Sequence, residues 1–329
     1  MKRRGYVIEE ICEMDNLRLA YWKAKRGKSA KQEVVRYTAD LQDHLLELRE
    51  LLWQGKIPPI QYHYFTVFDP KERQICATNF HQRVLQHALM NVCHVDFERY
   101  QTNDSNASRL RRGTYVALEK AIANQKRYKY CLQLDVRKYF DSIKHDVLKQ
   151  QLKRMYKDER LLRIFEQIID SYSVTEGRGL PIGNLTSQYF ANHYLAAADH
   201  YVREQLRVKA YVRYMDDMNL WDNDLRELKR IGKALQAFIE DELGLQLKVF
   251  LLAPTENMCT FLGYRIARHS QCLSRRSVAR YEQKLRDLYW KYNQGVLNQE
   301  EMNSHLLPLV GFTMHVASGF QRAKVMASL

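Results

Sequence analysis

The sequence lacks the features that mark zinc modules, secreted scaffolds and membrane proteins. It has six cysteines in 329 residues, and no two form a Cys-x-x-Cys pair, which argues against a zinc module and a disulfide framework. It has no run of about 18 apolar residues, so no membrane-spanning helix is expected. The basic N-terminus is not followed by an apolar signal core. These absences predict a soluble protein from a reducing compartment.

Positive charge and aromatic rings, by contrast, are plentiful. The 52 Lys and Arg outnumber the 38 Asp and Glu, which leaves a formal net charge of +14. Such a surplus favours a polyanionic partner, because binding to phosphates releases counterions. Net charge alone does not name that partner. The 21 tyrosines favour nucleic acid, since rings can stack on bases.

The first half of the sequence alternates between helical and strand patterns. Asp15 and Thr38 are expected to cap two helices, the second with leucines at helical spacing. Residues 62–75 predict a strand, a turn and a second strand. Asn79 is expected to cap the next helix, and Thr114 to begin another.

The second half predicts one recurring fold unit. Stripped of extra helices, it reads as β-α-β-β-α-β, the split βαβ arrangement. The expected strands are 130–135, the hairpin 211–220 and 245–252, and the expected helices are 145–155, 160–169, 184–205 and one capped by Asp224. Residues 261–266 are expected to form one more strand, followed from Arg275 by two or three helices with a basic face.

Two adjacent acids, Asp216 and Asp217, stand between apolar, β-prone runs and predict a hairpin with carboxylates at its tip. An isolated Asp-Asp is more often a solvated turn. In a split βαβ unit the two inner strands are antiparallel neighbours, so the strand ending at Asp135 can bring a third carboxylate. Mg²⁺ prefers oxygen ligands, and nucleotidyl transfer uses two cations about 3.5–4 Å apart. These three acids, with the carbonyl of Val136, therefore predict a two-metal site.

Other residues are suited to a bound nucleotide: Lys71, Arg73, Phe140, Gly183, Gln188 and Lys248. The cations near the early turn could grip a triphosphate, and Lys248 could protonate the leaving group. The ring of Phe140 could pack under the sugar, and Gly183 lets another backbone approach closely. Each residue also has a plainer interpretation: a solvated charge, a core ring or an ordinary helix cap.

Together these residues resemble the reverse transcriptases, and most closely those of diversity-generating retroelements. The resemblance extends from Tyr62 to the end of the sequence, with the motifs in the family's order. The matching segments are 73–75, 80–89, 106–114, 134–143, 182–188, 214–217 and 261–264.

The resemblance implies an α+β fold of the right-hand polymerase type. The implied parts are an N-terminal helical extension (1–55), fingers (56–129), a first palm segment (130–172), a fingers–palm segment carrying motif B (173–195), a second palm segment (196–271) and a helical thumb (272–329).

The resemblance also implies roles for individual residues. The three acids and Val136 would bind two Mg²⁺ ions, for which Mn²⁺ could substitute, and Lys248 falls near a catalytic lysine of the family. Phe140 would be the steric gate against a 2′-hydroxyl. Contacts to the incoming nucleotide fall on Lys71, Arg73, Gly183 and Gln188. Contacts to template and primer fall on Arg83, Arg109, Arg112, Tyr214, Met215, Phe261, Gly263, Arg275 and Arg276.

Two positions point to the mutagenic subgroup. Retroviral and group II intron enzymes typically have Gln where this sequence has Ile182, and Pro where it has Gln188. Gln can hydrogen-bond near the template base, whereas Ile can only pack, and a lost polar contact is worth about 1–3 kcal/mol. We therefore expect Ile182, with Arg73, to set fidelity. The sequence does not match the retron pattern Asn-Ala-x-x-His, because Leu110 stands where His is expected. The sequence is also expected to leave no room for a ribonuclease H or maturase domain.

The sequence thus predicts an Mg²⁺-dependent RNA-directed DNA polymerase that miscopies template adenines. The implied partners are template RNA, cDNA, the RNA:DNA duplex, dNTPs and a small basic accessory protein, often a pentamer, docking on the first 55 residues or the fingers. No membrane is implied, and the setting would be the cytoplasm, with a bacterial or phage gene. The alternatives are a group II-like or defence-associated reverse transcriptase of ordinary fidelity and a non-catalytic RNA-binding scaffold with the same fold.

Overall fold

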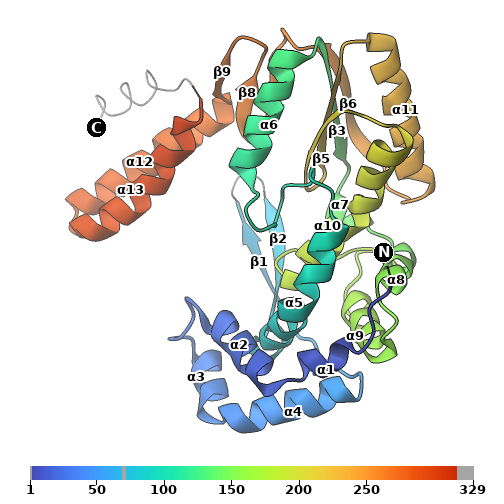
Figure 1. Cartoon of the computed structure of the whole chain (residues 1–329). Helices are drawn as coiled ribbons and strands as arrows, with labels where there is room; N and C mark the ends of the chain where they lie inside the picture. The colour runs from blue at the N-terminus through green and yellow to red at the C-terminus, as the bar shows by residue number, and fades with distance from the viewer. Residues whose placement is uncertain (1, 69–71, 317–329) are drawn as a thin grey trace. The chain divides into compact units, whose positions relative to one another are not determined.

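The computed structural model describes residues 2–68 and 72–316 (Figure 1). The chain divides into two compact units, each assembled from three stretches of sequence. The first unit comprises Met1–Arg109, Asp135–Arg207 and Ala234–Lys248, and the second comprises Leu110–Leu134, Val208–Lys233 and Val249–Leu329. The boundaries cut through β3 (Tyr130–Val136), α11 (Leu225–Asp241) and β6 (Leu247–Pro254), so these three elements contribute to both units.

The first unit is mostly helical. Its own elements are α1 (Val7–Ile11), α2 (Met14–Lys25), α3 (Gln32–Ala39), α4 (Leu41–Trp53), β1 (Tyr62–Val67), β2 (Arg73–Thr78), α5 (Phe80–Tyr100), α7 (Tyr139–Ser142), α8 (His145–Met155), α9 (Glu159–Asp170), α10 (Leu185–His200) and the π-helix η1 (Tyr201–Gln205). Helices α1, α2, α3 and α10 all pack against α5. The buried face of α2 consists of Leu17, Ala20, Tyr21 and Ala24, which have the i, i+3, i+4, i+7 spacing of a single helical stripe.

Helix caps in the first unit test the sequence-based expectations directly. Asn79 caps α5 as predicted, and its side chain accepts a hydrogen bond from the backbone of Gln82 at 2.9 Å. The expected cap at Asp15 is wrong, because α2 begins at Met14 and Asp15 lies inside the first turn, where its charge suits the helix dipole. The expected cap at Thr38 is also wrong. Thr38 lies inside α3, and its hydroxyl donates back to the carbonyl of Val34 at 2.6 Å.

The second unit is organised on a four-stranded sheet with strand order β4-β5-β3-β6. Its own elements are α6 (Thr114–Arg127), β4 (Ala210–Tyr214), β5 (Asp217–Asp222), β7 (Cys259–Phe261), β8 (Tyr264–Ile266), β9 (Gln271–Leu273), α12 (Arg275–Asn293) and α13 (Gln299–Met314). β3 and β5 are antiparallel, with Leu134 opposite Met218. This is the strand order of the predicted split βαβ unit, with β3 and β5 as its inner pair.

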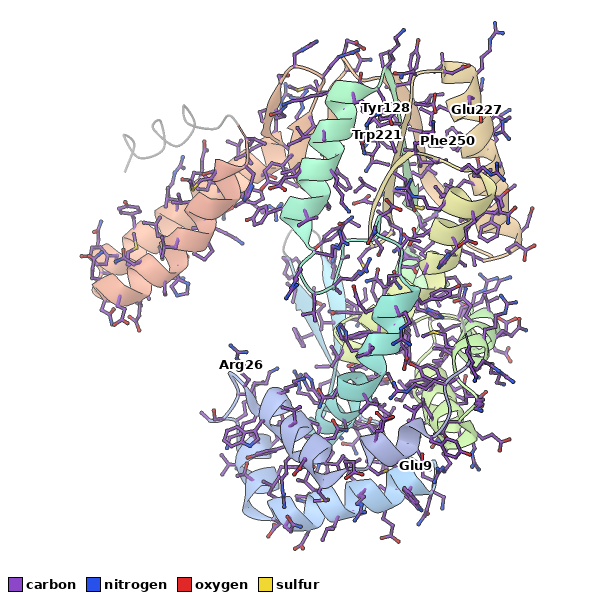
Figure 2. All side chains as sticks on the ribbon, viewed as in Figure 1. Glu9, Arg26, Tyr128, Trp221, Glu227 and Phe250 are labelled. Atoms are coloured by element: carbon purple, nitrogen blue, oxygen red, sulfur yellow. The ribbon has the colours of Figure 1, made fainter. Side chains whose placement is uncertain are left out.

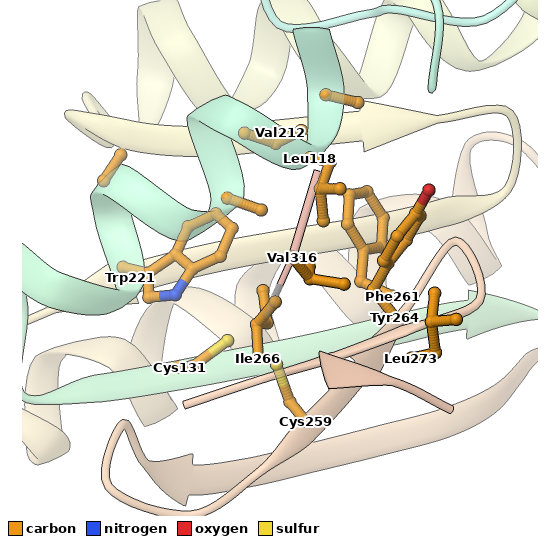
Figure 3. Packing of buried hydrophobic residues seen from close by; sticks show 13 residues of the cluster. Leu118, Cys131, Val212, Trp221, Cys259, Phe261, Tyr264, Ile266, Leu273 and Val316 are labelled. Atoms are coloured by element: carbon orange, nitrogen blue, oxygen red, sulfur yellow. The ribbon is translucent and has the colours of Figure 1, made fainter. Parts of the chain in front are cut away.

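The core of the second unit lies between the sheet, α6 and a smaller sheet of β7, β8 and β9 (Figure 3). Trp221 of β5 is buried, and its indole N–H donates to the side-chain oxygen of Gln125 on α6 at 2.8 Å. Leu118 of α6 and Ile266 of β8 belong to the same cluster. The hydrogen bond to Gln125 satisfies the polar edge of a ring that is otherwise buried.

Residues 261–266 form a hairpin, so the expectation of a single strand was wrong. Strands β7 and β8 pair with Phe261 opposite Tyr264, and the turn residues Leu262 and Gly263 have φ values of 52° and 88°. Two successive left-handed residues make the tight turn typical of two-residue hairpins. The apolar run concealed this turn because only Gly263 signals it in the sequence.

Helices α12 and α13 pack on each other through Tyr281 and Leu285. They are tied to the small sheet, because the hydroxyl of Tyr264 donates to the carbonyl of Phe312 at 2.7 Å. The mixture of helices and antiparallel sheets confirms an α+β fold, while the boundaries of fingers, palm and thumb stay predictions. Among the described residues, no helix is long and apolar enough to cross a membrane.

Candidate active site

The acidic hairpin of the second unit is formed as predicted. Tyr214 of β4 pairs with Asp217 of β5, which leaves Met215 and Asp216 as the two residues of the turn. Met215 has φ 54°, a left-handed conformation that costs a side-chain-bearing residue about 1–2 kcal/mol. Asp216 and Asp217 are half-buried at this tip. The turn therefore holds two carboxylates on a short, conformationally restricted segment.

A buried arginine, Arg213, forms a hydrogen bond to the turn. Arg213 is fully buried, although it is a charged residue in the middle of β4. Its guanidinium donates to the carbonyl oxygen of Met215 at 3.0 Å. A charge-assisted hydrogen bond of this kind stabilises the strained residue from inside the fold.

The first unit holds the third predicted acid. Asp135 follows Leu134, the last residue of β3 that pairs with β5. The Asp135 carboxylate lies 3.9 Å from the ammonium nitrogen of Lys248 on β6. The amide of Arg137 donates to the carbonyl of Gln246 at 2.8 Å and holds this end of β3. Val136 is buried in β3.

The predicted donors are carboxylate and carbonyl oxygens, which fit Mg²⁺ or Mn²⁺ better than a soft metal. Within the described residues, His, Cys, Asp and Glu side chains form no group of three or more arranged to hold a metal ion. Asp135 belongs to one unit and the other two acids to the second. The donor chemistry therefore fits the ions, and the shared site stays a prediction.

The predicted nucleotide contacts gather in the first unit around β2. The amide of Cys76 on β2 donates to the carbonyl of Ile182 at 2.8 Å. Gly183 has φ 114°, and a Cβ there would come within 2.7 Å of the Ile75 side chain. The amide of Leu180 donates to the carbonyl of Phe140 at 2.9 Å. The segment 180–183 thus links β2, which begins at Arg73, to the helix that carries Phe140.

The side chains in this group are accessible to a ligand. Arg73 and Gln188 are exposed, and Phe140 and Ile182 are half-buried. The neighbouring ring of Tyr139 is buried instead, and its hydroxyl donates to the carbonyl of Ala191. Burial of Tyr139 fixes the short helix α7 and leaves Phe140 on its accessible side. Lys71, also predicted to contact the nucleotide, lies outside the described residues.

Two side chains predicted to contact template or primer are buried against other parts of the protein. Arg109 is almost fully buried, and its guanidinium bonds the Glu98 carboxylate at 2.6 Å and the carbonyl of Ser105 at 2.8 Å. Phe261 is buried in the core of the second unit. Arg109 therefore holds its own loop and Phe261 holds the small sheet, and neither side chain is available to nucleic acid.

The remaining predicted contacts have surfaces that could meet nucleic acid. Arg275 and Arg276 are exposed in the first turn of α12, while Arg83, Arg112, Tyr214 and Met215 are half-buried. The Tyr214 hydroxyl accepts a hydrogen bond from Thr114 at 3.2 Å. The carbonyl of Gly263 accepts from the hydroxyl of Ser277 at 2.7 Å, so this turn anchors α12.

Arg213 is the residue of this site that the sequence-based reasoning missed. It lies two residues before Met215, inside a run that otherwise predicts a buried strand. A charged residue at an inward position of such a strand is unusual, because buried arginines need partners. That mismatch was the signal that could have found it.

Two comparisons relate the chain to known proteins. Residues 69–266 match the family described as "Reverse transcriptase (RNA-dependent DNA polymerase)". The chain is also similar to the "Uncharacterized 91 kDa protein in cob intron" of Schizosaccharomyces pombe, with 28% identity over 126 residues. That similarity covers 36% of this chain and 16% of the yeast protein, so the matched part is a small portion of that relative.

Proposed function

Because this chain belongs to the reverse transcriptase family, we propose that it is an RNA-directed DNA polymerase, a nucleotidyltransferase that extends a primer with dNTPs along a template RNA. One observation carries the proposal beyond family membership. Two adjacent carboxylates sit on the restrained turn between β4 and β5, and β5 pairs directly with β3. Rigid strands are the supports that a metal-dependent phosphoryl-transfer site requires.

We assign metal binding to Asp135, Asp216 and Asp217, with the carbonyl of Val136 as a further oxygen. Two bound Mg²⁺ ions would activate the attacking hydroxyl and neutralise charge on the leaving pyrophosphate. The protein's own contribution is to hold the acids, through the β3–β5 register and through Arg213 under the turn. Lys248, whose ammonium lies 3.9 Å from the Asp135 carboxylate, would orient that carboxylate and supply a proton to the leaving group.

The nucleotide would be bound by the group around β2. Exposed Arg73, with Lys71, supplies positive charge for a triphosphate. Phe140 on the accessible side of α7 would pack under the sugar and exclude a 2′-hydroxyl. Gly183 allows the loop to approach β2 closely, and we assign Ile182 and Gln188 to the same nucleotide site. Arg83, Arg112, Tyr214, Met215, Arg275 and Arg276 remain the proposed template and primer contacts.

The finer proposal is that this polymerase belongs to a diversity-generating retroelement and miscopies template adenines. The support is the aliphatic Ile182 with Gln188, where enzymes of ordinary fidelity typically have Gln and Pro. The carbonyl of Ile182 accepts a hydrogen bond from β2, which holds the backbone of this residue in place. A small accessory protein, as a pentamer, would assist RNA binding in such an element.

The polymerase proposal is tested by extension of a DNA primer on an RNA template. We expect Asp216→Asn to lower the rate by several orders of magnitude. Asp222→Asn makes the same change at the other end of β5 and should keep wild-type activity. Extension by Asp216→Asn at the wild-type rate would instead favour a non-catalytic RNA-binding scaffold and remove the metal assignment.

The fidelity proposal needs a separate measurement. Misincorporation opposite template adenine is compared with misincorporation opposite the other three bases. We expect excess errors at adenine and a reduction of that excess in Ile182→Gln, since a hydrogen-bonding side chain is restored at this position. Uniform errors in the wild type would assign the protein to a reverse transcriptase group of ordinary fidelity.

A further inference from the structure

Positive charge concentrates at one end of the helical N-terminal segment of the first unit. Between positions 18 and 36 the sequence has seven Lys and Arg and one acid, Glu33. These cations are Arg18, Lys23, Lys25, Arg26, Lys28, Lys31 and Arg36, on α2, on α3 and in the loop between them. Figure 2 shows Arg26 projecting outward just after the end of α2. This density of charge is far above the average for the chain.

Part of this charge meets α5. Helix α2 packs on α5, and the ammonium of Lys23 donates to the side-chain oxygen of Asn91 at 2.6 Å. Arg83 and His87 precede Asn91 by eight and four residues, so all three lie along one face of α5. Burial and then the charges of Arg83, Lys23 and Lys28 lower the pKa of His87 to about 4.

The loop completes the group. Burial and then the charges of Arg83 and Lys31 lower the pKa of Lys28. The charges of Lys23, Lys28 and Arg83 thus act on His87, and those of Arg83 and Lys31 act on Lys28. We call this group the α2–α5 cationic cluster.

Acids neutralise the cluster only in part: the charge of Glu33 opposes that of Arg83 and Lys31 at Lys28. Across the part of the chain that the structure describes, none of Lys23, Lys28, Lys31 and Arg83 forms an ion pair with a carboxylate. Like charges held together destabilise the folded state unless an anion neutralises them. The arrangement therefore points to a ligand that carries several negative charges.

An exposed aromatic ring lies beside the cluster. The Trp22 side chain on the outer face of α2 is 66% exposed, and the Lys25 ammonium lies 5.7 Å from its ring centroid. An accessible indole among cations is suited to stack on an unpaired base while the cations meet phosphates.

We propose that the α2–α5 cationic cluster, with Trp22 at its edge, binds a single-stranded segment of RNA through Lys23, Lys28 and Lys31, beyond the proposed template contact at Arg83. The choice of RNA over other polyanions rests on the proposed function, which makes the template an RNA. The same charge argues against this face as the docking site of a basic accessory protein, because like charges repel across an interface.

The test measures RNA affinity as a function of salt, with no dNTP and no metal present. Lys28→Gln/Lys31→Gln removes two cluster charges, and Lys153→Gln/Arg154→Gln removes two exposed charges on α8 as the matched control. Each phosphate contact on a single strand contributes about 0.7 to the magnitude of the slope of log affinity against log salt. Because the cluster variant loses two such contacts, the magnitude of its slope should fall by about 1.4. Affinity at about 0.1 M salt should fall more than about tenfold in the cluster variant. The control should match the wild type.

Trp22→Ala provides an independent readout. It should weaken binding of unpaired RNA by roughly tenfold and leave the salt slope unchanged, because stacking releases no counterions. Equal effects in the cluster and control variants, or none in either, would refute the site. Tighter binding of DNA of the same sequence, or loss of binding to anionic lipid vesicles but not to RNA, would overturn the RNA assignment. An inactive polymerase does not affect this result, since the assay needs no synthesis.

Discussion

Replacing Arg213 by methionine removes the guanidinium beneath the acidic turn while keeping an unbranched side chain of similar length. Arg213 is fully buried and donates to the Met215 carbonyl at 3.0 Å. A hydrogen bond to a charged group contributes about 1.5–3 kcal/mol, and Met215 holds a left-handed conformation that costs about 1–2 kcal/mol. The hydrogen-bond energy that is lost with the guanidinium is therefore about as large as the conformational cost of Met215.

The consequence should appear in catalysis. If the lost energy is expressed as a lower population of the competent turn, the extension rate falls by about 10-fold to 150-fold, since 1.4 kcal/mol corresponds to a factor of ten. The loss should be larger at low Mg²⁺ and partly recovered as Mg²⁺ is raised, because ion binding selects the ordered turn. Arg213→Lys keeps the charge and should retain more activity than Arg213→Met.

The assay is single-turnover primer extension over a range of Mg²⁺ concentrations, alongside denaturant unfolding. Arg203→Met is the matched control, because it removes a guanidinium from an ion pair with Asp104 in the first unit. It should lower stability without changing the Mg²⁺ dependence. An Arg213→Met protein that is folded and extends primers within about twofold of the wild type would refute the role of Arg213.

Two further predictions concern the first unit. Gly183→Ala should destabilise the protein by about 1–3 kcal/mol and raise the KM for dNTPs, because Gly183 has φ 114° and a Cβ there would come within 2.7 Å of Ile75. Gly113→Ala is the control in the same unfolding assay. Gly113 has φ 125° and no neighbour within 4 Å among the described residues, so this variant measures the backbone cost alone. His193 is buried against the rings of Phe97 and Tyr100, and burial lowers its pKa to about 3. Because the unfolded chain binds this proton more readily, the stability of the wild type falls as pH drops from about 6.5 towards 3. The stability of His193→Phe relative to the wild type should therefore rise by about 1.4 kcal/mol for each pH unit of that drop. A stability difference between the two proteins that does not change with pH in denaturant unfolding would contradict this.

Local signals in the sequence located most of the elements. Asn79 and Asp224 cap the helices that follow them, and Asp224 does so by accepting from the amides of Arg226 and Glu227. Capping depends on neighbours within one helical turn, so it can be read from a short window. The cap expected at Thr38 failed for a related reason: Thr38 also lies within one turn of a carbonyl acceptor, at Val34, and a hydroxyl there suits the helix interior equally well.

The roles of long charged side chains were harder to predict. Arg109 was expected to contact nucleic acid, yet it binds Glu98 eleven residues earlier and the carbonyls of its own loop. Arg213 was not expected to matter, yet it is buried under the acidic turn. An arginine reaches far enough to find partners in several directions, and the sequence around it does not say which partner it takes.

The sequence by itself determined the acidic hairpin, the order of the βαββαβ unit and the membership of the reverse transcriptase family. These follow from strand periodicity, helix caps and motif order, which are all local or linear properties. Tertiary structure alone decided that Arg213 supports the turn, that Gly183 packs against Ile75, and that Lys23 of α2 and Lys28 of the next loop lie near His87 of α5. Those outcomes depend on burial and on which distant segments pack together, and chain folding sets both over separations that no sequence window covers.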